Sequence, residues 1–410
     1  MRGAGTKLAI TSDRAQAVLL DITRLVSRVG RGPLTGVDRV EYAYLEWVLG
    51  TDAPVHGLAR LASGHVLLDR AGLETFLRKL DGDIPWGVKD LRAWLGIKTP
   101  DARGRAEADL RKLAVARSGK TSLPKLPAGV YVNVGHSNMS DVTLGGAKAQ
   151  GLKIAVFVHD MIPLDFPQFQ RPGTVESFEA KMRLGAAHSD LIIANSKDTA
   201  QRVVSYLGNW GIQVPSIVDA HLGVPALEGS KTTENRPYYC TIGTIEPRKN
   251  HALLLDIWED MTAEERPDLH IIGGRGWNND AVFARLDALK GASWLHEHNA
   301  MEDEALIRLL SGAHGLLFPS FAEGFGLPSL EAAQLGVPVI CGDLAIHREV
   351  LGDYPVYAPL EDRYFWKKTI LEQARQRQKD LVHASKAKTV KIPTWSEHFD
   401  AVNAALNSLR

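Results

Sequence analysis

Short apolar runs that alternate with helical patterns constrain the fold of this chain more than any other feature. Apolar runs at residues 17–22, 152–158 and 191–194 are each followed by polar residues and then by a segment with helical spacing. Such runs are typical of strands that are buried on both faces of a parallel sheet. A second series of the same kind begins at residue 238. The sequence therefore predicts two α/β units with parallel sheets.

A polar stretch separates the two series. Residues 228–237 spell EGSKTTENRP, a composition typical of a linker. We therefore expect a first domain over residues 1–228 and a second over residues 229–394, followed by an amphipathic helix over residues 395–410. Two α/β domains in tandem favour a ligand site in the cleft between them.

The charge balance argues against one large class of functions. Lys plus Arg equal Asp plus Glu at 48 each, so bulk charge does not favour nucleic-acid binding, and we expect no nucleic-acid partner. The two cysteines, Cys240 and Cys341, lie in apolar runs and are predicted to be buried thiols of a cytoplasmic protein. Residues 1–16 contain no apolar run of signal-peptide length, and no apolar span approaches the roughly 20 residues of a membrane helix. Any membrane association is therefore expected to be peripheral.

The most informative stretch for chemistry is residues 316–336, LLFPSFAEGFGLPSLEAAQLG. Its apolar start predicts a strand, and a glycine-containing loop follows. Pro328 is predicted to be the first helical residue, because its fixed φ suits that position, and Gly336 is predicted to end the helix. The free N–H groups at such a helix start, together with the helix dipole, favour an anion there.

Two carboxylates bracket this predicted anion site. Glu323 lies in the loop, and Glu331 is placed in the first helical turn. They would contact different parts of one ligand. The alternatives are structural, because Glu331 would also complement the helix dipole, and Gly324 and Gly326 would serve as turn residues.

A cation pair follows the strand predicted at residues 238–244. Arg248 and Lys249 stand in front of a helix that Asn250 is expected to cap. Two cations there can neutralise a diphosphate leaving group without a metal. The alternative for the pair alone is an ordinary solvated surface pair.

Three features of the first domain leave alternatives open. Residues 30–36 give G-x-G-x-x-x-G ending at Gly36, which misses the dinucleotide fingerprint, so we reject nicotinamide binding and keep both a ligand-approach loop and a surface loop. His159 and Asp160 follow a buried strand, where a functional and a structural role are both open. Residues 81–83 spell D-G-D, for which a turn is favoured over a metal site.

A basic segment also has two interpretations. Residues 89–125 contain ten Lys or Arg against four Asp or Glu, interleaved with apolar residues. The segment would either lie on anionic lipid or form a solvated helix pair on the face of a domain.

Taken together, two motifs resemble the retaining nucleotide-sugar glycosyltransferases of family 4. They are G-T-I-E-P-R-K-N at residues 243–250 and F-P-S-F-A-E-G-F-G-L-P-S-L-E-A at residues 318–332, the second of which holds the E-x7-E pair Glu323 and Glu331. Residues 193–197, I-A-N-S-K, and His159 with Asp160 are similar to landmarks of the family's first domain. The resemblance implies the GT-B fold, in which two Rossmann-like domains face a cleft and the last helix crosses back to the first domain.

The resemblance also implies roles for individual residues. Arg248 and Lys249 would hold the donor diphosphate, Glu331 the ribose hydroxyls, and Glu323 would face the donor sugar. His159 would lie near the reacting sugar. The resemblance further points to Asp21, and the remaining donor-binding residues are Gly324, Phe325, Gly326, Leu327, Gly36 and Gly243. The implied catalytic set is therefore Glu323, His159, Arg248 and Lys249, with no metal ligand.

The function implied is retaining transfer of a hexose to a glycan or lipid-linked oligosaccharide acceptor, as in bacterial surface polysaccharide or glycolipid assembly. The donor would be GDP-mannose or, next, a UDP-sugar, with no metal or other cofactor. We expect a cytoplasmic enzyme, with residues 89–125 as the candidate contact to the inner face of the membrane. Two alternatives remain, a non-catalytic nucleotide-sugar or glycan-binding protein and a sugar phosphorylase of the same fold.

Overall fold

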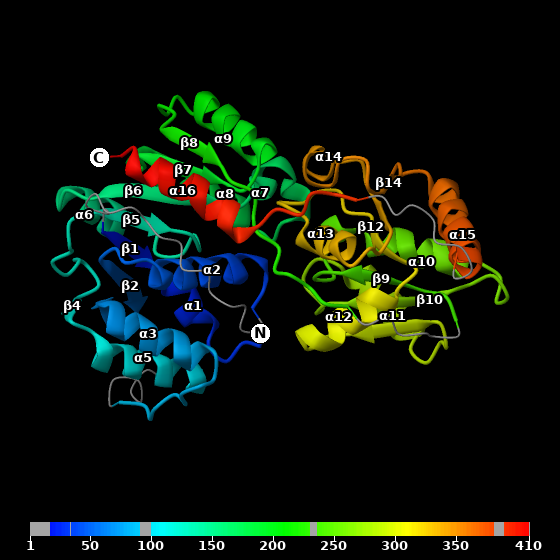
Figure 1. Ribbon diagram of the computed structural model, residues 1–410, viewed down its shortest axis with the longest axis horizontal. Helices are drawn as coiled ribbons and strands as arrows, with labels where there is room; N and C mark the ends of the chain where they lie inside the picture. The colour runs from blue at the N-terminus through cyan, green and yellow to red at the C-terminus, as the bar shows by residue number, and fades with distance from the viewer. Residues whose placement is uncertain (1–16, 33, 91–99, 230–235, 381–388, 410) are drawn as a thin grey trace. The chain divides into compact units, whose positions relative to one another are not determined.

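The computed structural model describes residues 17–32, 34–90, 100–229, 236–380 and 389–409. The chain forms two compact units (Figure 1). Unit 1 comprises Met1–His159, Ser177–Leu222 and Trp395–Arg410, and unit 2 comprises Asp160–Glu176 and Gly223–Thr394. None of the helices within the described residues is long and apolar enough to cross a membrane.

Unit 1 is built on an eight-stranded sheet of order β4-β3-β2-β1-β5-β6-β7-β8. Neighbouring strands from β2 to β8 in this order pair parallel. The apolar runs predicted as strands form the middle of this sheet, where both faces are covered. The strands are Val18–Asp21 (β1), Val55–Leu61 (β2), Gly64–Leu68 (β3), Ala116–Ser118 (β4), Val130–Asn133 (β5), Lys153–Val158 (β6), Leu191–Ala194 (β7) and Ser216–Asp219 (β8).

One edge of this sheet differs from the all-parallel prediction. β3 pairs antiparallel with both β2 and β4. The sequence does not predict the strands β2, β4 and β8. Their sequences, VHGLARL, ARS and SIVD, mix polar residues or glycine with apolar ones, so none of them has the continuous apolar run that marks a buried strand.

Helices in unit 1 connect these strands, and the parallel connections require them. The short helix α1 was not predicted. The helices are Thr23–Arg28 (α1), Gly36–Gly50 (α2), Arg70–Leu80 (α3), Asp101–Leu113 (α5), Asp141–Ala149 (α6), Thr174–His188 (α8), Lys197–Asn209 (α9) and Trp395–Asn407 (α16).

The C-terminal helix α16 packs on unit 1, beside β7 and β8 (Figure 1). Phe399 stacks on Trp47 of α2 with ring centroids 4.7 Å apart. His398 is buried, and its Nδ1 donates to the carbonyl of Ala220 at 3.1 Å, so its Nε2 accepts from the Tyr44 hydroxyl at 2.9 Å. Although the preceding segment belongs to unit 2, α16 therefore belongs to unit 1, as expected.

Unit 2 is built on a six-stranded parallel sheet of order β11-β10-β9-β12-β13-β14. Its strands are Tyr238–Ile242 (β9), Asp268–Ile272 (β10), Leu295–His298 (β11), Gly315–Phe318 (β12), Val339–Cys341 (β13) and Val356–Tyr357 (β14). Its α-helices are Ile162–Asp165 (α7), His251–Glu259 (α10), Asp280–Ala288 (α11), Asp303–Gly312 (α12), Leu327–Gln334 (α13), Ala345–Leu351 (α14) and Arg363–Asp380 (α15).

The core of unit 2 joins its sheet to α10 and α15. Trp258 and Trp366 are fully buried, and each indole N–H donates to a backbone carbonyl, that of Pro267 at 2.8 Å and that of Pro359 at 2.9 Å. Such pairing removes the cost of burying the indole N–H. Cys240 and Cys341 are buried free thiols, as predicted.

Residues 160–176 belong to unit 2, although the sequence predicts that they belong to the first domain. The segment is held to unit 2 by its backbone, because Trp277 donates to the carbonyl of Phe169 and Asn278 to that of Gln170. The guanidinium of Arg171 also lies 5.0 Å from the Trp277 ring centroid. In the predicted linker, residues 230–235 lie outside the described residues.

Candidate functional site

The loop after β9 starts at a glycine whose backbone conformation is unfavourable for other residues. Gly243 has φ +142°, and a Cβ atom there would lie 3.1 Å from Cε of Lys249. The loop continues through a short 3-10 helix, Pro247–Lys249 (η2), to Asn250. Asn250 occupies the N-cap position of α10, but its φ is +53° and its side chain makes no capping hydrogen bond. A side-chain cap normally needs an extended N-cap backbone.

This loop meets the loop after β12 through a buried ion cluster. Lys249 Nζ lies 2.6 Å from Glu323 Oε1, and an Arg248 guanidinium nitrogen lies 3.1 Å from Glu323 Oε2. Arg248 Nε also pairs with Glu246 at 2.6 Å. The side chain of Glu323 is only 6% exposed. The structure thus brings together three of the four predicted catalytic residues, Glu323, Arg248 and Lys249.

Electrostatics favour the charged forms of Glu323 and Arg248, whereas burial lowers the pKa of Lys249 and raises that of Glu246. Burial alone would raise the pKa of Glu323, but the charges of Lys249 and Arg248 outweigh it and lower that pKa to about 2. Burial acts to lower the pKa of Arg248, whereas Glu323 and Glu246 raise it, and the net shift is upward. Buried ion pairs contribute little net stability compared with apolar residues of similar volume. A function therefore explains the cluster better than stability does.

The glycine loop leads into α13 one residue earlier than predicted. Gly326, at φ +84°, is the N-cap, and Leu327 begins the helix, so Pro328 is its second residue. Glu331 therefore lies in the second turn rather than the first, and its part in complementing the helix dipole is correspondingly reduced. Gly336 ends the helix as predicted, with φ +69°. The N–H groups of Gly336 and Val337 bond the carbonyls of Ala333 and Ala332 in a Schellman arrangement.

Two buried polar atoms near these loops lack a partner. His347 is fully buried, and its Nδ1 donates to the carbonyl of Gly342, which leaves Nε2 as an acceptor with no hydrogen-bond partner among the described residues. A Cβ atom on Gly326 would lie 3.6 Å from that Nε2 atom. In the part of the chain that the structure describes, Glu246 Oε2 is likewise buried without a donor. Neither residue is predicted as functional from the sequence, although Glu246 lies inside the first motif.

Together these loops can bind an anion. The site offers two cations on one side and, on the other, the N-terminal end of α13, where the helix dipole favours negative charge. Lys249 also lies 4.5 Å from the Phe318 ring centroid, a contact that fixes its ammonium group. Glu331 is buried on α13. An anion such as a diphosphate would fit this combination of cationic side chains and helix dipole.

His159, the fourth predicted catalytic residue, lies in unit 1, directly after β6. Its Nε2 donates to the carbonyl of Val134 at 2.7 Å, and its own carbonyl accepts from Asn195. Burial and the neighbouring His136 hold the pKa of His159 well below its ordinary value. The imidazole is therefore neutral at physiological pH, and Nδ1 is the ring nitrogen left for a ligand.

Gly36 and Asp21 are also in unit 1. Gly36 is the first residue of α2, and a Cβ atom there would meet no other heavy atom within 4 Å among the described residues. Asp21 is buried and accepts hydrogen bonds from Tyr131 and Asn138 at 2.8 Å each and from the N–H of Thr23 at 3.0 Å. Asp21 therefore holds neighbouring loops together.

Several basic side chains in the described part of residues 89–125 form ion pairs with acidic side chains of the same segment. Lys89 and Arg105 both pair with Asp101, and the buried Arg111 pairs with Asp90. This pairing favours the interpretation as a helix packed on its domain, whereas residues 91–99 lie outside the described residues. The D-G-D at residues 81–83 forms a turn after α3, as favoured.

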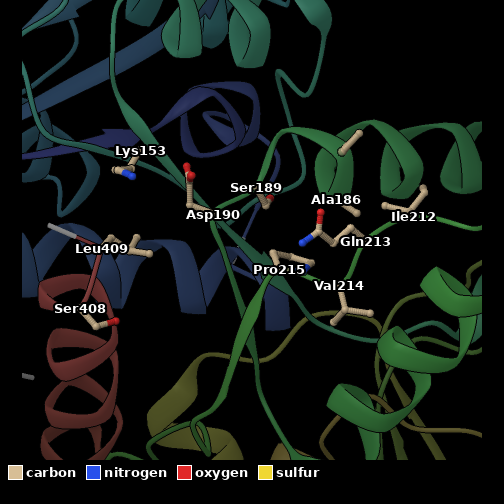
Figure 2. A pocket seen from close by; sticks show the side chains of 11 residues that line it. Lys153, Ala186, Ser189, Asp190, Ile212, Gln213, Val214, Pro215, Ser408 and Leu409 are labelled. Atoms are coloured by element: carbon tan, nitrogen blue, oxygen red, sulfur yellow. The ribbon is translucent and has the colours of Figure 1, made fainter.

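Among the described residues of unit 1, two of the cavities lie at opposite ends of the strands of its sheet. One, of about 590 Å³, lies at the amino ends of β6 and β8, between Lys153, Pro215 and Leu409, which follows α16 (Figure 2). Asp190 in its wall is already bonded to Lys148 and to the N–H of Ile154. The other cavity, of about 580 Å³, lies at the carboxyl ends of β1, β2 and β5. Ligands of open α/β sheets bind at the carboxyl edge.

Most of unit 2 is similar to known glycosyltransferases. Residues 226–368 match the family model described as Glycosyl transferases group 1. Serotype-specific mannosyltransferase WbdA of Escherichia coli is 30% identical over 234 residues, which cover 51% of this chain and 28% of that protein. O-antigen chain mannosyltransferase B of Escherichia coli is 38% identical over 127 residues, which cover 30% of this chain and 33% of that protein. The matches thus span no more than about a third of these relatives.

A solved structure matches nearly the whole chain. The crystal structure of Anabaena Alr3699/HepE in complex with UDP-glucose aligns with a TM-score of 0.60 at 13% identity, covering 96% of this chain and 98% of that chain. This chain therefore has the GT-B fold, as the sequence motifs predict. The ion cluster of Glu323, Arg248 and Lys249 lies within the residues that match the glycosyltransferase model.

Proposed function

We propose that this chain is a retaining hexosyltransferase that moves mannose from a nucleotide-diphosphate sugar to a glycan or lipid-linked acceptor. The observation that carries the proposal is the buried cluster of Lys249, Arg248 and Glu323, in front of the glycine loop, inside a group 1 glycosyltransferase domain. The cluster supplies the charges that a diphosphate leaving group requires.

In the proposed reaction, the bond between the donor sugar's anomeric carbon and the diphosphate oxygen breaks. A bond forms between that carbon and an acceptor hydroxyl oxygen on the same face, and the acceptor proton passes to the departing phosphate. Arg248 and Lys249 stabilise the negative charge that develops on the diphosphate. Because these cations neutralise that charge, the step we propose requires no metal. Glu323 holds both cations and faces the sugar, and Glu331 binds the ribose.

The relatives' names support mannose and a polysaccharide acceptor, since both are mannosyltransferases and one acts on O-antigen chains. We therefore propose GDP-mannose as the donor, with UDP-sugars as the next candidates. Cys240 and Cys341 are unpaired thiols, which fits work in the cytoplasm. The proposal includes peripheral contact with the inner face of the membrane through residues 89–125.

Two other functions are compatible with the fold. A non-catalytic sugar-binding protein would bind the donor without consuming it, and a sugar phosphorylase would need phosphate as co-substrate. The ionised cluster favours transfer over mere binding, because a binding protein does not need charges aimed at a leaving group. Slow donor hydrolysis without acceptor would separate transfer from binding, and release of a sugar phosphate would identify the phosphorylase.

A thermal-shift panel of GDP- and UDP-sugars tests the proposal. We expect one of them to raise the melting temperature of the wild type, because a ligand that binds only the folded state stabilises it. Arg248→Ala and Glu331→Ala should lose that shift and the transfer activity, whereas the exposed-site controls Lys290→Ala and Glu304→Ala should keep both. The proposal fails if no nucleotide sugar shifts the wild type and Arg248→Ala transfers as well as the wild type does.

A separate measurement tests whether transfer retains the anomeric configuration of the donor sugar. Proton NMR of the product formed from an α-linked donor should show an α-linked sugar before any anomerisation. A β-linked product would reject the retaining mechanism and leave the transferase assignment in place.

A further inference from the structure

The cavity at the carboxyl edge of the unit 1 sheet is lined by four cationic side chains from four different parts of the chain. Arg60 comes from β2, Arg103 from α5, Lys120 from the segment after β4 and Lys181 from α8. None of the described residues that line this cavity is acidic. The chain as a whole is balanced at 48 basic and 48 acidic residues, so this concentration of charge is local.

Three of these cations have no counter-ion within the described structure. Arg103 pairs with the buried Glu107 at 3.0 Å. The side chains of Arg60, Lys120 and Lys181 are exposed and form no ion pair with any residue that the structure describes. Like charges that face one cavity repel one another, and an anion between them removes that repulsion.

Another part of the cavity lining, residues 136–139, is held by hydrogen bonds. Asn138 is 3% exposed, and its side chain donates to Asp21 at 2.8 Å and accepts from Thr143 at 2.9 Å. His136 and Asn138 both have positive φ, at +53° and +60°, so this loop is held in one unusual conformation by its contacts. Burial lowers the pKa of His136 to about 4, which keeps this part of the lining neutral and leaves the charge of the cavity to the Arg and Lys side chains.

We propose that this cavity binds a phosphate-class anion on the acceptor, so that the preferred acceptor is a phosphorylated glycan or a phosphate-linked lipid rather than a neutral sugar. The identification of the ligand as an acceptor rests on the proposed transferase function. The identification of an anion site rests on the cavity alone. Arginine and lysine at the edge of a sheet recognise phosphate by charge-assisted hydrogen bonds. The hydroxyl of Thr23 in the same lining accepts from the N–H of Arg60 and can donate its proton to a remaining phosphate oxygen.

The test is pyrophosphate binding by calorimetry in saturating GDP, which fills the donor site. The cavity variant is R60Q/K120Q/K181Q, and the matched control is R78Q/K125Q/K153Q. The control removes the same three charges from exposed positions of unit 1 outside this cavity. We expect the cavity variant to bind pyrophosphate at least tenfold more weakly than the control. Equal affinities in the two variants would overturn the proposal.

Flotation with phosphatidylcholine vesicles, with and without phosphatidic acid, identifies the source of the anion. Loss of phosphatidic acid-dependent flotation in the cavity variant alone assigns it to a lipid headgroup. Equal flotation of both variants, with pyrophosphate binding lost only in the cavity variant, assigns it to a soluble phosphate. The nucleotide-sugar thermal shift of the cavity variant should equal that of the control. If the wild type binds pyrophosphate here but no nucleotide sugar, the transferase function fails and the anion site stands.

Discussion

The ammonium nitrogen of Lys249 lies 2.6 Å from a carboxylate oxygen of Glu323, although 74 positions separate the two residues. β9 and β12 are parallel neighbours in the sheet, so the loops that follow them emerge side by side. The N–H of Phe321 also donates to the carbonyl of Arg248 at 2.8 Å, which locks the two loops together. The sheet order thus assembles an ionised cluster from two distant motifs.

Glu323→Gln should separate the structural and catalytic parts of this cluster. The amide keeps the shape but removes the charge, so two cations lose their counter-ion and unfolding becomes easier by about 3 kcal/mol, as for other broken buried pairs. GDP should then recover more stability in the variant than in the wild type, because its diphosphate replaces the missing charge. Transfer should fall by about a hundredfold or more.

Urea unfolding with and without GDP measures both stability effects of Glu323→Gln. The control is Glu302→Gln, an exposed carboxylate of unit 2 whose loss should change stability by less than about 0.5 kcal/mol. If GDP stabilised Glu323→Gln no more than the wild type, the cations would not face the diphosphate.

Two glycines at the ends of α13 form a matched pair. Gly326 and Gly336 have φ of +84° and +69°. Alanine at either position should cost about 1 kcal/mol, because a Cβ atom disfavours that backbone region. Only Gly326→Ala should also weaken donor binding, since its Cβ would lie 3.2 Å from Ser329 Oγ at the helix start, whereas Gly336 faces no described atom within 4 Å.

Thermal unfolding and nucleotide-sugar titration of Gly326→Ala and Gly336→Ala check this difference. Equal donor affinity in the two variants would mean that the start of α13 does not contact the donor.

The buried His398 should make the stability of unit 1 decrease in acid. Its buried ring donates to Ala220 and accepts from Tyr44, and burial lowers its pKa to about 4. The unfolded state, with a histidine pKa near 6.5, binds the proton more readily, so stability is complete above about pH 6.5 and falls as the pH decreases. Between pH 7.5 and 5, this one group should cost about 2 kcal/mol.

Urea unfolding at the two pH values measures the effect. Between pH 7.5 and 5, His398→Gln should lose about 2 kcal/mol less of its free energy of unfolding than the wild type does. The control is His188→Gln, which changes a histidine of the same unit that is not buried. An identical pH dependence in His398→Gln and the wild type would contradict the assignment.

The sequence predicts those parts of the molecule that local pattern determines. The apolar runs of β1, β6 and β12 and the glycine that ends α13 at Gly336 carry their own local signatures, so their elements were predicted. β2 and β8 were not, because strands with polar residues are defined by their neighbours in the sheet.

The candidate site also has a part that the sequence predicts and a part that it does not. Arg248, Lys249 and Glu323 stand out in their motifs, but their mutual contact depends on the order of β9 and β12, which no local pattern specifies. The Nε2 atom of His347, which has no hydrogen-bond partner among the described residues, is a tertiary feature with no sequence signature. The same holds for the cavity of unit 1, whose cations, such as Arg60 and Lys181, come from separate elements.

The most direct test of the account is calorimetric titration of GDP and guanosine into the wild type and Lys249→Met. Methionine keeps the length of the buried side chain and removes its charge. We expect GDP to bind Lys249→Met about ten to a hundredfold more weakly, the value of one charged hydrogen bond. Guanosine, which lacks the diphosphate, should bind both proteins equally. Equal GDP affinity in the two proteins would contradict the claim that this cluster holds the donor diphosphate.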